Sequence, residues 1–185
     1  MRFEPLTRGG GYEFESKVSG GAIPKNLIPA VSDGVEEAMK RGGKYGYPMV
    51  DLRAICLDGK HHSVDSSELS FKMAGSLALR GALDEVGVKV LEPVSDVHVH
   101  VLNQHLGDVL GDLNSRRGQV QGTGGGDTAD SSTIHAHVPT SEIRRYAIDL
   151  RSMTGGTGRF EAAHLGYQPL PDHLVASIQG DDDAD

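Results

Sequence analysis

One stretch of strict alternation, residues 94–102, constrains the fold of this chain more than any other feature of its sequence. Its apolar members include Val97, Val99 and Val101, and its polar members include Asp96, His98 and His100. A period of two places successive side chains on opposite faces of a strand, so one face is buried and the other meets solvent. The chain must therefore build a sheet that is covered on one side.

The residues after this stretch alternate between helical and extended patterns. The sequence predicts a helix over 107–115, strands over 118–122 and 133–139 around a mobile glycine-rich loop, a helix begun by Thr140 or Ser141, and a strand over 159–164. Together with the strand over 94–102, these elements have the order βαββαβ. This is the order of the ferredoxin-like fold.

A second set of elements precedes the first. The sequence predicts a strand hairpin over 2–5 and 12–18, an amphipathic helix from Ile28 to the glycines at 42–43, a strand over 49–57 and a helix that ends near residue 86. Asp65 and Glu68 resemble a capping box at the start of the last helix. The apolar side chains of that helix fall on one stripe, Leu69, Met73 and Leu77, with Phe71, Ala74, Ala78 and Ala82 beside it.

The dipeptide Glu92-Pro93 interrupts the pattern between the two sets. Proline restricts itself and the residue before it, and it commonly lies in a connection. We therefore expect an α/β (α+β) chain of two small sandwich domains, over residues 1–91 and 92–170. Residues 171–185 end in an acidic run, which is typical of a disordered, solvated tail.

The balance of charge limits the partners of the chain. The formal net charge is −8, from 26 acidic and 18 basic residues, which argues against a protein that coats nucleic acid through bulk electrostatics. Any contact with RNA must therefore be local.

The single cysteine, Cys56, excludes an intrachain disulfide, and we expect a cytoplasmic protein. No apolar run approaches the roughly 20 residues of a membrane helix, so a membrane partner is not expected. We expect a monomer.

The sequence carries no catalytic motif that we recognise. It lacks a G-x-x-x-x-G-K-[ST] phosphate loop, a G-x-S-x-G elbow and an H-E-x-x-H helix. Cys56 lies in a predicted strand, where a small half-buried side chain is the preferred interpretation. We therefore assign no catalytic residue, cofactor or metal to the chain.

Two His-x-His pairs remain of interest, His98 with His100 and His135 with His137. The first and third strands of a ferredoxin-like sheet are neighbours, so the two pairs are expected to lie side by side on the open face. Grouped imidazoles bind Zn²⁺ when the geometry is suitable. An uncoordinated histidine patch is the alternative, and it is the one we prefer on sequence alone.

Several longer strings carry a family resemblance. They are residues 11–14 (GYEF), 20–24 (GGAIP), 46–51 (GYPMVD), 64–69 (VDSSEL), 91–93 (LEP), 107–118 (GDVLGDLNSRRG) and 146–152 (YAIDLRS). In this order and spacing the chain, from about residue 2 to 170, resembles domains IV and V of elongation factor G. The resemblance implies a truncated, ribosomal-protein-like domain IV followed by a ferredoxin-like domain V.

In that family domain IV is the part that enters the ribosomal A site, and its tip meets the decoding region with transfer RNA and messenger RNA. The tip loop aligns with Asp58, Gly59, Lys60, His61 and His62. The resemblance thus implies that these five residues contact RNA. Without it, a solvated hairpin is the simpler interpretation of the loop.

Domain V of the family lies near the stalk base and the sarcin-ricin region of the large subunit. The resemblance makes Asn114, Ser115, Arg116, Arg117 and Arg151 candidates for a second RNA contact. Arg116 and Arg117 also suit the negative end of a helix dipole, which is their structural alternative. Asp108 and Asp112 are interpreted as a solvated face or cap.

The sequence departs from the family pattern at its start. The first strand of domain IV, a second tip loop and the GTPase domain are not present in it, so GTP is expected only in the GTPase domain. Two functions follow: a ribosome-binding module of a translational GTPase that promotes tRNA–mRNA translocation, or a free-standing or truncated regulatory module that occupies the factor site. Metal-assisted hydrolysis by the histidines is a distant third.

Overall fold

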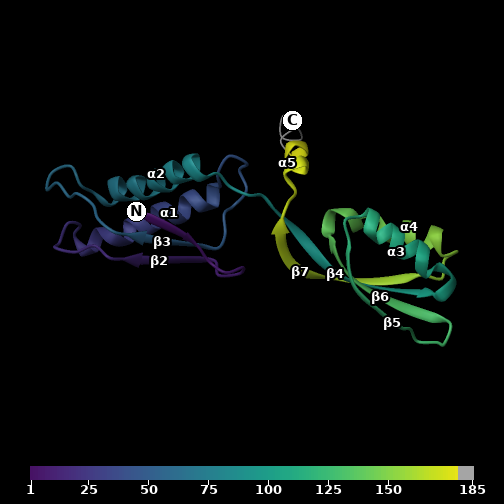
Figure 1. Cartoon of the computed structure of the whole chain (residues 1–185). Helices are drawn as coiled ribbons and strands as arrows, with labels where there is room; N and C mark the ends of the chain where they lie inside the picture. The colour runs from purple at the N-terminus through teal and green to yellow at the C-terminus, as the bar shows by residue number, and fades with distance from the viewer. Residues whose placement is uncertain (179–185) are drawn as a thin grey trace. The chain divides into compact units, whose positions relative to one another are not determined.

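The computed structural model describes residues 1–178, and its contacts divide the chain into two units, Met1–Val90 and Leu91–Asp185. Each unit has its own sheet with helices on one face (Figure 1). This mixed α/β architecture of two small layered units confirms the predicted fold class. None of the helices among the described residues is long and apolar enough to cross a membrane.

The N-terminal unit has three strands and two α-helices. In chain order they are β1 (Arg2–Pro5), β2 (Tyr12–Ser16), the short 3-10 helix η1 (Lys25–Leu27), α1 (Ile28–Arg41), β3 (Leu52–Cys56) and α2 (Glu68–Val86). The strand order is β1-β3-β2, with β3 antiparallel to β1 and parallel to β2. Both α-helices lie over the same side of the sheet (Figure 1).

The predicted hairpin of the first two strands is wrong, because β3 lies between them. Ala54, Ile55 and Cys56 of β3 are almost fully buried, whereas β1 and β2 are mostly half-buried or exposed. The most apolar strand takes the central position, where it gains cover from both neighbours. The two short polar strands form the edges of the sheet, where their unpaired backbone groups can form hydrogen bonds with water.

Helices α1 and α2 approach each other closely at two glycines. A Cβ atom placed on Gly34 would lie 1.9 Å from the carbonyl oxygen of Lys72, and one placed on Gly75 would lie 2.3 Å from that of Val31. No real Cβ can approach a carbonyl oxygen so closely. The absence of a side chain at both positions therefore lets the two backbones touch.

The face that α2 buries differs from the predicted stripe. Its buried residues are Phe71, Gly75 and Leu79, while Leu69, Met73 and Leu77 are 67%, 56% and 60% exposed. Both sets are apolar and both follow helical spacing, so periodicity alone cannot choose between them. The contact at Gly75 decides it, since only that face can approach α1.

The C-terminal unit has the predicted βαββαβ order. Its elements are β4 (Leu91–Leu102), η2 (Asn103–His105), α3 (Leu106–Ser115), β5 (Gln119–Gly125), β6 (Ser131–Pro139), η3 (Thr140–Ile143), α4 (Tyr146–Met153), β7 (Arg159–Pro169) and the extra helix α5 (Asp172–Ile178). The strand order is β5-β6-β4-β7 and every neighbouring pair is antiparallel. This is the ferredoxin-like arrangement.

The core of this unit lies between the sheet and the helices α3 and α4. Its buried members are Val97, Val99, Val101, Val109, Leu113, Ile134, Ala136, Val138, Tyr146 and Leu150. The alternation along β4 thus has the predicted effect, with its valines in the core. The ring of Tyr146 packs edge-on against Phe160, with centroids 5.0 Å apart.

Two segments that were predicted to be irregular, a connection and a part of the tail, belong instead to regular elements. Glu92 and Pro93 lie inside β4, where Pro93 pairs only with Tyr167 of β7 and the pairing with β6 starts one residue later. Proline is tolerated here because no strand needs its missing N–H on that side. The predicted disordered tail is wrong over residues 172–178, which form α5, and its acidic run lies outside the described residues.

Candidate nucleic-acid interface

The predicted tip loop leaves the sheet at the carboxyl end of β3. Its turn is closed by short-range hydrogen bonds: the Gly59 N–H donates to Asp58 Oδ1 at 2.8 Å, and the His62 N–H donates to Ser66 Oγ at 2.8 Å. The Ser66 N–H donates back to the His62 carbonyl oxygen at 3.1 Å. These bonds hold the backbone in place while the side chains stay in solvent.

The five predicted residues lie together in this loop. Asp58, Lys60, His61 and His62 are exposed, and the His62 side chain keeps 79% of its surface accessible. Its Nδ1 lies 3.8 Å from Asp65 Oδ2, a loose contact between two exposed groups. The loop therefore presents one ammonium group and two imidazoles to the solvent.

Gly59 has a packing role as well. A Cβ atom at this position would lie 2.5 Å from Cδ1 of the buried Ile23. The loop backbone thus rests directly on the segment between β2 and η1. Beside it, the Lys17 N–H donates to the Cys56 carbonyl oxygen at 2.8 Å, which continues the parallel pairing of β2 with β3.

The segment 17–23 lies beside the tip loop. The sequence did not predict that this segment and the loop are neighbours. A hairpin of the first two strands would have placed it elsewhere, because the parallel pairing of β2 and β3 is what brings it beside the loop. Lys17 is exposed there, and its Nζ lies 3.3 Å from Glu15 Oε1. A βαβ pattern over strand 12–16, α1 and strand 52–56 is the signal that would have found it.

The loop ends at the start of α2 with a capping box, two residues later than predicted. Ser67 is the N-cap: its Oγ accepts from the Ser70 N–H at 3.1 Å, and Ser70 Oγ accepts from the Ser67 N–H at 2.8 Å. Serine replaces glutamate as the reciprocal partner. Asp65 is consequently left in the loop, near His62.

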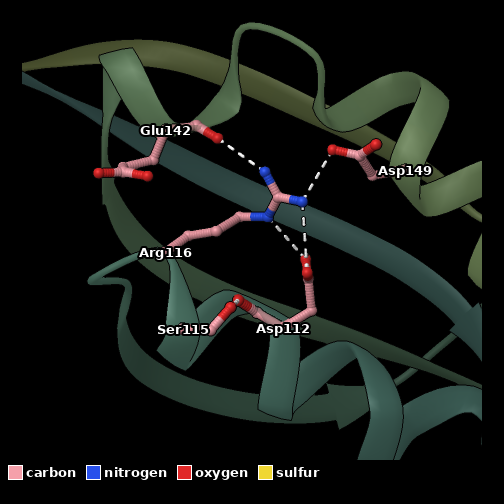
Figure 2. Close-up of polar contacts among 5 residues, drawn as sticks. All are labelled: Asp112, Ser115, Arg116, Glu142 and Asp149. Atoms are coloured by element: carbon pink, nitrogen blue, oxygen red, sulfur yellow. Dashed lines mark hydrogen bonds and ion pairs between the residues drawn. The ribbon is translucent and has the colours of Figure 1, made fainter.

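The second group of predicted residues is divided by the structure. Arg116 ends α3 and is held by three groups (Figure 2): Nε donates to Asp112 at 2.7 Å, Nη1 donates to the Glu142 carbonyl oxygen at 2.9 Å, and Nη2 donates to Asp149 at 2.8 Å. Its side chain is only 18% exposed. The hydrogen bond to Asp112 contributes most to raising the pKa of Arg116.

Arg117 has a similar environment. Its guanidinium forms a two-pronged pair with Glu92, at 2.7 and 2.9 Å, and donates from Nε to Glu142 at 3.0 Å. Glu92 is buried, so Arg117 compensates a charge that would be costly to leave alone. Arg116 and Arg117 thus tie α3 to β4, η3 and α4.

These contacts change the sequence interpretation of Asp112. Asp112 is not a solvated residue, since it pairs with Arg116, whereas Asp108 is exposed as expected. Asn114, Ser115 and Arg151 are exposed on α3 and α4. That any of these residues contacts RNA stays a prediction.

The architecture and the two groups of residues define a class: two small α/β domains, one with an exposed loop that carries a lysine and two histidines, and one with ferredoxin-like topology. The family models agree with this class and identify the family. Residues 1–87 match the model of elongation factor G, domain IV, and residues 89–178 match that of the elongation factor G C-terminus. The chain belongs to the elongation factor G family, and neither matched region is the GTPase domain.

Individual relatives show the same likeness. The chain is 48% identical over 181 residues to the elongation factor G-like protein of Mycobacterium tuberculosis (strain CDC 1551 / Oshkosh) and 43% identical over 181 residues to elongation factor G of Aquifex pyrophilus. These matches cover 97% and 98% of this chain. The chain spans about a quarter of the length of both relatives, 25% and 26%.

The fold has a solved counterpart. A crystal structure of a protein from Thermus thermophilus superposes with a TM-score of 0.83 at 34% identity, over 99% of this chain and 27% of that one. The family resemblance seen in the sequence is therefore confirmed along nearly the whole chain.

Proposed function

We propose that this chain is a ribosome-binding module of a translational GTPase, and that it promotes the movement of transfer RNA and messenger RNA. One observation carries the proposal. In the unit that matches elongation factor G domain IV, the loop of Asp58 to His62 projects from the sheet with its cationic and imidazole side chains in solvent. The expected partner of this loop is the RNA of the decoding region.

The chemistry of the loop suits a local RNA contact. Lys60 supplies a cation for a phosphate group, and the imidazoles of His61 and His62 stack on a base or donate to ribose and phosphate oxygens. A chain with a net charge of −8 cannot bind RNA through its whole surface. The interaction is thus confined to such a loop.

The C-terminal unit supplies the second contact in this proposal. Asn114, Ser115 and Arg151 are exposed and are assigned to the large subunit, near the stalk base. Arg116 and Arg117 hold the end of α3 in place for that contact, since their donors are engaged within the unit. GTP binding and hydrolysis are assigned to the GTPase domain of the family.

We expect His62→Ala in a full-length factor to slow translocation at least about tenfold, the loss that accompanies a stacking or hydrogen-bonding contact of about 1.4 kcal/mol or more. Ribosome-stimulated GTP hydrolysis is expected to change little, because the loop acts on RNA and not on nucleotide. Rapid-mixing measurements of mRNA movement and of phosphate release test the two rates separately.

Lys44→Ala is the matched control for this experiment. Lys44 is exposed in the same unit, but it follows the carboxyl end of α1, away from the loop. Its removal should leave both rates unchanged. Impaired hydrolysis with normal movement in the His62 variant would refute the assignment of the loop.

A further inference from the structure

The open face of the C-terminal sheet carries a cluster of three histidines around one aspartate. Strands β4 and β6 lie side by side, and their register places His98 opposite His135 and Asp96 opposite His137. The residues between them along each strand are buried in the core, so all four side chains share the outer face. The topology thus gathers four groups that can bind metal.

The membership of the cluster differs from the expected four histidines. His100 lies opposite Thr133, and its Nδ1 is 3.0 Å from Thr133 Oγ1, so its ring is engaged at the next position along the strand. Asp96 takes the fourth place instead. The sequence interpretation counted imidazoles and overlooked the carboxylate on the same face of β4.

Two of the three distances from Asp96 are close to those between the ligands of one metal ion, and the third is a hydrogen bond. Asp96 Oδ1 is 2.5 Å from His135 Nε2 and 3.6 Å from His137 Nε2, and Asp96 Oδ2 is 3.6 Å from His98 Nε2. The ligand atoms of Asp96, His98 and His135 all lie within 4.8 Å of one another. In a tetrahedral zinc site, bonds of about 2.1 Å separate neighbouring ligand atoms by roughly 3.4 Å.

The three rings lie in contact with one another. His98 and His135 are stacked with centroids 4.5 Å apart and planes only 7° from parallel, and His137 meets His135 edge-on at 5.4 Å. Stacking of two imidazoles at this distance is unfavourable if both are protonated, because like charges repel. Small side-chain rotations would direct their nitrogens toward one ion.

The electrostatics favour a cation over a neutral ligand. Asp96 brings a carboxylate oxygen within 3.6 Å of a ring nitrogen of each of the three histidines. Glu161 lies opposite His98 on β7 and adds a second carboxylate beside the cluster. The four side chains are 30% to 45% exposed, which leaves the cluster open to an ion from solution.

We propose that Asp96, His98, His135 and His137 form a binding site for a divalent transition metal, with Zn²⁺ as the ion that fits best. Three imidazoles and one carboxylate are the ligand types that Zn²⁺ takes in proteins, and Mg²⁺ or Ca²⁺ would require more oxygen ligands. The ion links the two central strands of the sheet. The site is independent of the RNA contacts proposed above.

Calorimetric titration of the full chain with Zn²⁺, and the visible absorption of bound Co²⁺, test the site. We expect one ion per chain and tetrahedral Co²⁺ absorption. The double variant His98→Ala, His135→Ala should bind the ion at least about tenfold more weakly. Loss of a residue that only hydrogen-bonds a metal ligand already lowers metal affinity by about that factor. Asp96→Asn keeps the shape of the side chain and should also weaken binding, which guards against a misfolded double variant.

Two control variants separate this site from adventitious binding by other histidines. His100→Ala removes an imidazole from the same face of β4, and His61→Ala, His62→Ala removes the adjacent pair in the loop; both should retain the affinity for one ion. Equal heats for the native chain and the His98, His135 variant would overturn the proposal. So would loss of the ion in the loop variant alone, or uptake of no ion by the native chain.

Discussion

At the scale of single residues, Arg116 and Arg117 show how one local sequence serves two interpretations. Both are basic, both follow a helix, and both match a family string, yet each is bound by carboxylates of its own unit. Arg117 also adopts a positive φ of 59°, which directs its side chain back toward Glu92. In the structure, both side chains donate hydrogen bonds to carboxylates of the C-terminal unit, and Arg116 also donates to the carbonyl oxygen of Glu142.

We expect Arg116→Ala to destabilise the C-terminal unit by about 2 kcal/mol, because it removes charge-assisted hydrogen bonds from a largely covered site. The measurement is urea unfolding, monitored through the NMR signal of the Val99 amide. Arg116→Lys should restore little, since an ammonium group cannot reach three acceptors in the guanidinium geometry.

Arg151→Ala is the matched control, because Arg151 is exposed on α4. Its effect on stability should stay within about 0.5 kcal/mol. A loss for Arg151→Ala that equals the loss for Arg116→Ala would contradict the structural role assigned to the Arg116 contacts.

At the scale of elements, the crossing of α1 and α2 depends on backbone contact. Gly34 and Gly75 face each other's helix, so the buried stripe of α2 is chosen by the residue that has no side chain. The apolar stripe of Leu69, Met73 and Leu77 is left on the surface as a result. Close approach, more than hydrophobicity, orients this helix.

Gly75→Ala is therefore expected to destabilise the N-terminal unit by about 1 to 3 kcal/mol, the usual cost of forcing an extra methyl group into a packed contact. Gly81→Ala lies on the same helix and meets nothing within 4 Å, so it should raise stability by about 0.5 to 1 kcal/mol. Thermal and urea unfolding of both variants give the comparison. The same sign of change for both glycines would disprove the close helix crossing.

At the scale of the whole molecule, the two units differ in the size of their sheets. The N-terminal sheet has three strands of four or five residues, whereas the C-terminal sheet has four strands of seven to twelve. Small sheets with short strands open more readily than large ones. The two units should accordingly have different stabilities.

We expect native-state hydrogen exchange to be faster at the amides of β3 than at those of the central part of β4, from Val97 to Val101. Both strands have a partner on each side, so the comparison reports the stability of the units and not an exposed edge. Mass spectrometry of peptides from each strand gives the rates. Equal or greater protection of β3 would contradict this prediction.

The sequence by itself determined the strands and the helices α1 to α4, the βαββαβ order, the buried valines of β4 and the family, because periodicity, glycine positions and long strings are local properties. It also placed the five loop residues together, since they are consecutive. Only the tertiary structure decided that β3 lies between β1 and β2, which stripe of α2 is buried, that Asp96 joins three histidines, and that Arg116 and Arg117 are paired internally. Each of these depends on contacts between residues distant in the chain, and such contacts are selected by packing and charge pairing in three dimensions, for which local patterns offer several equivalent solutions.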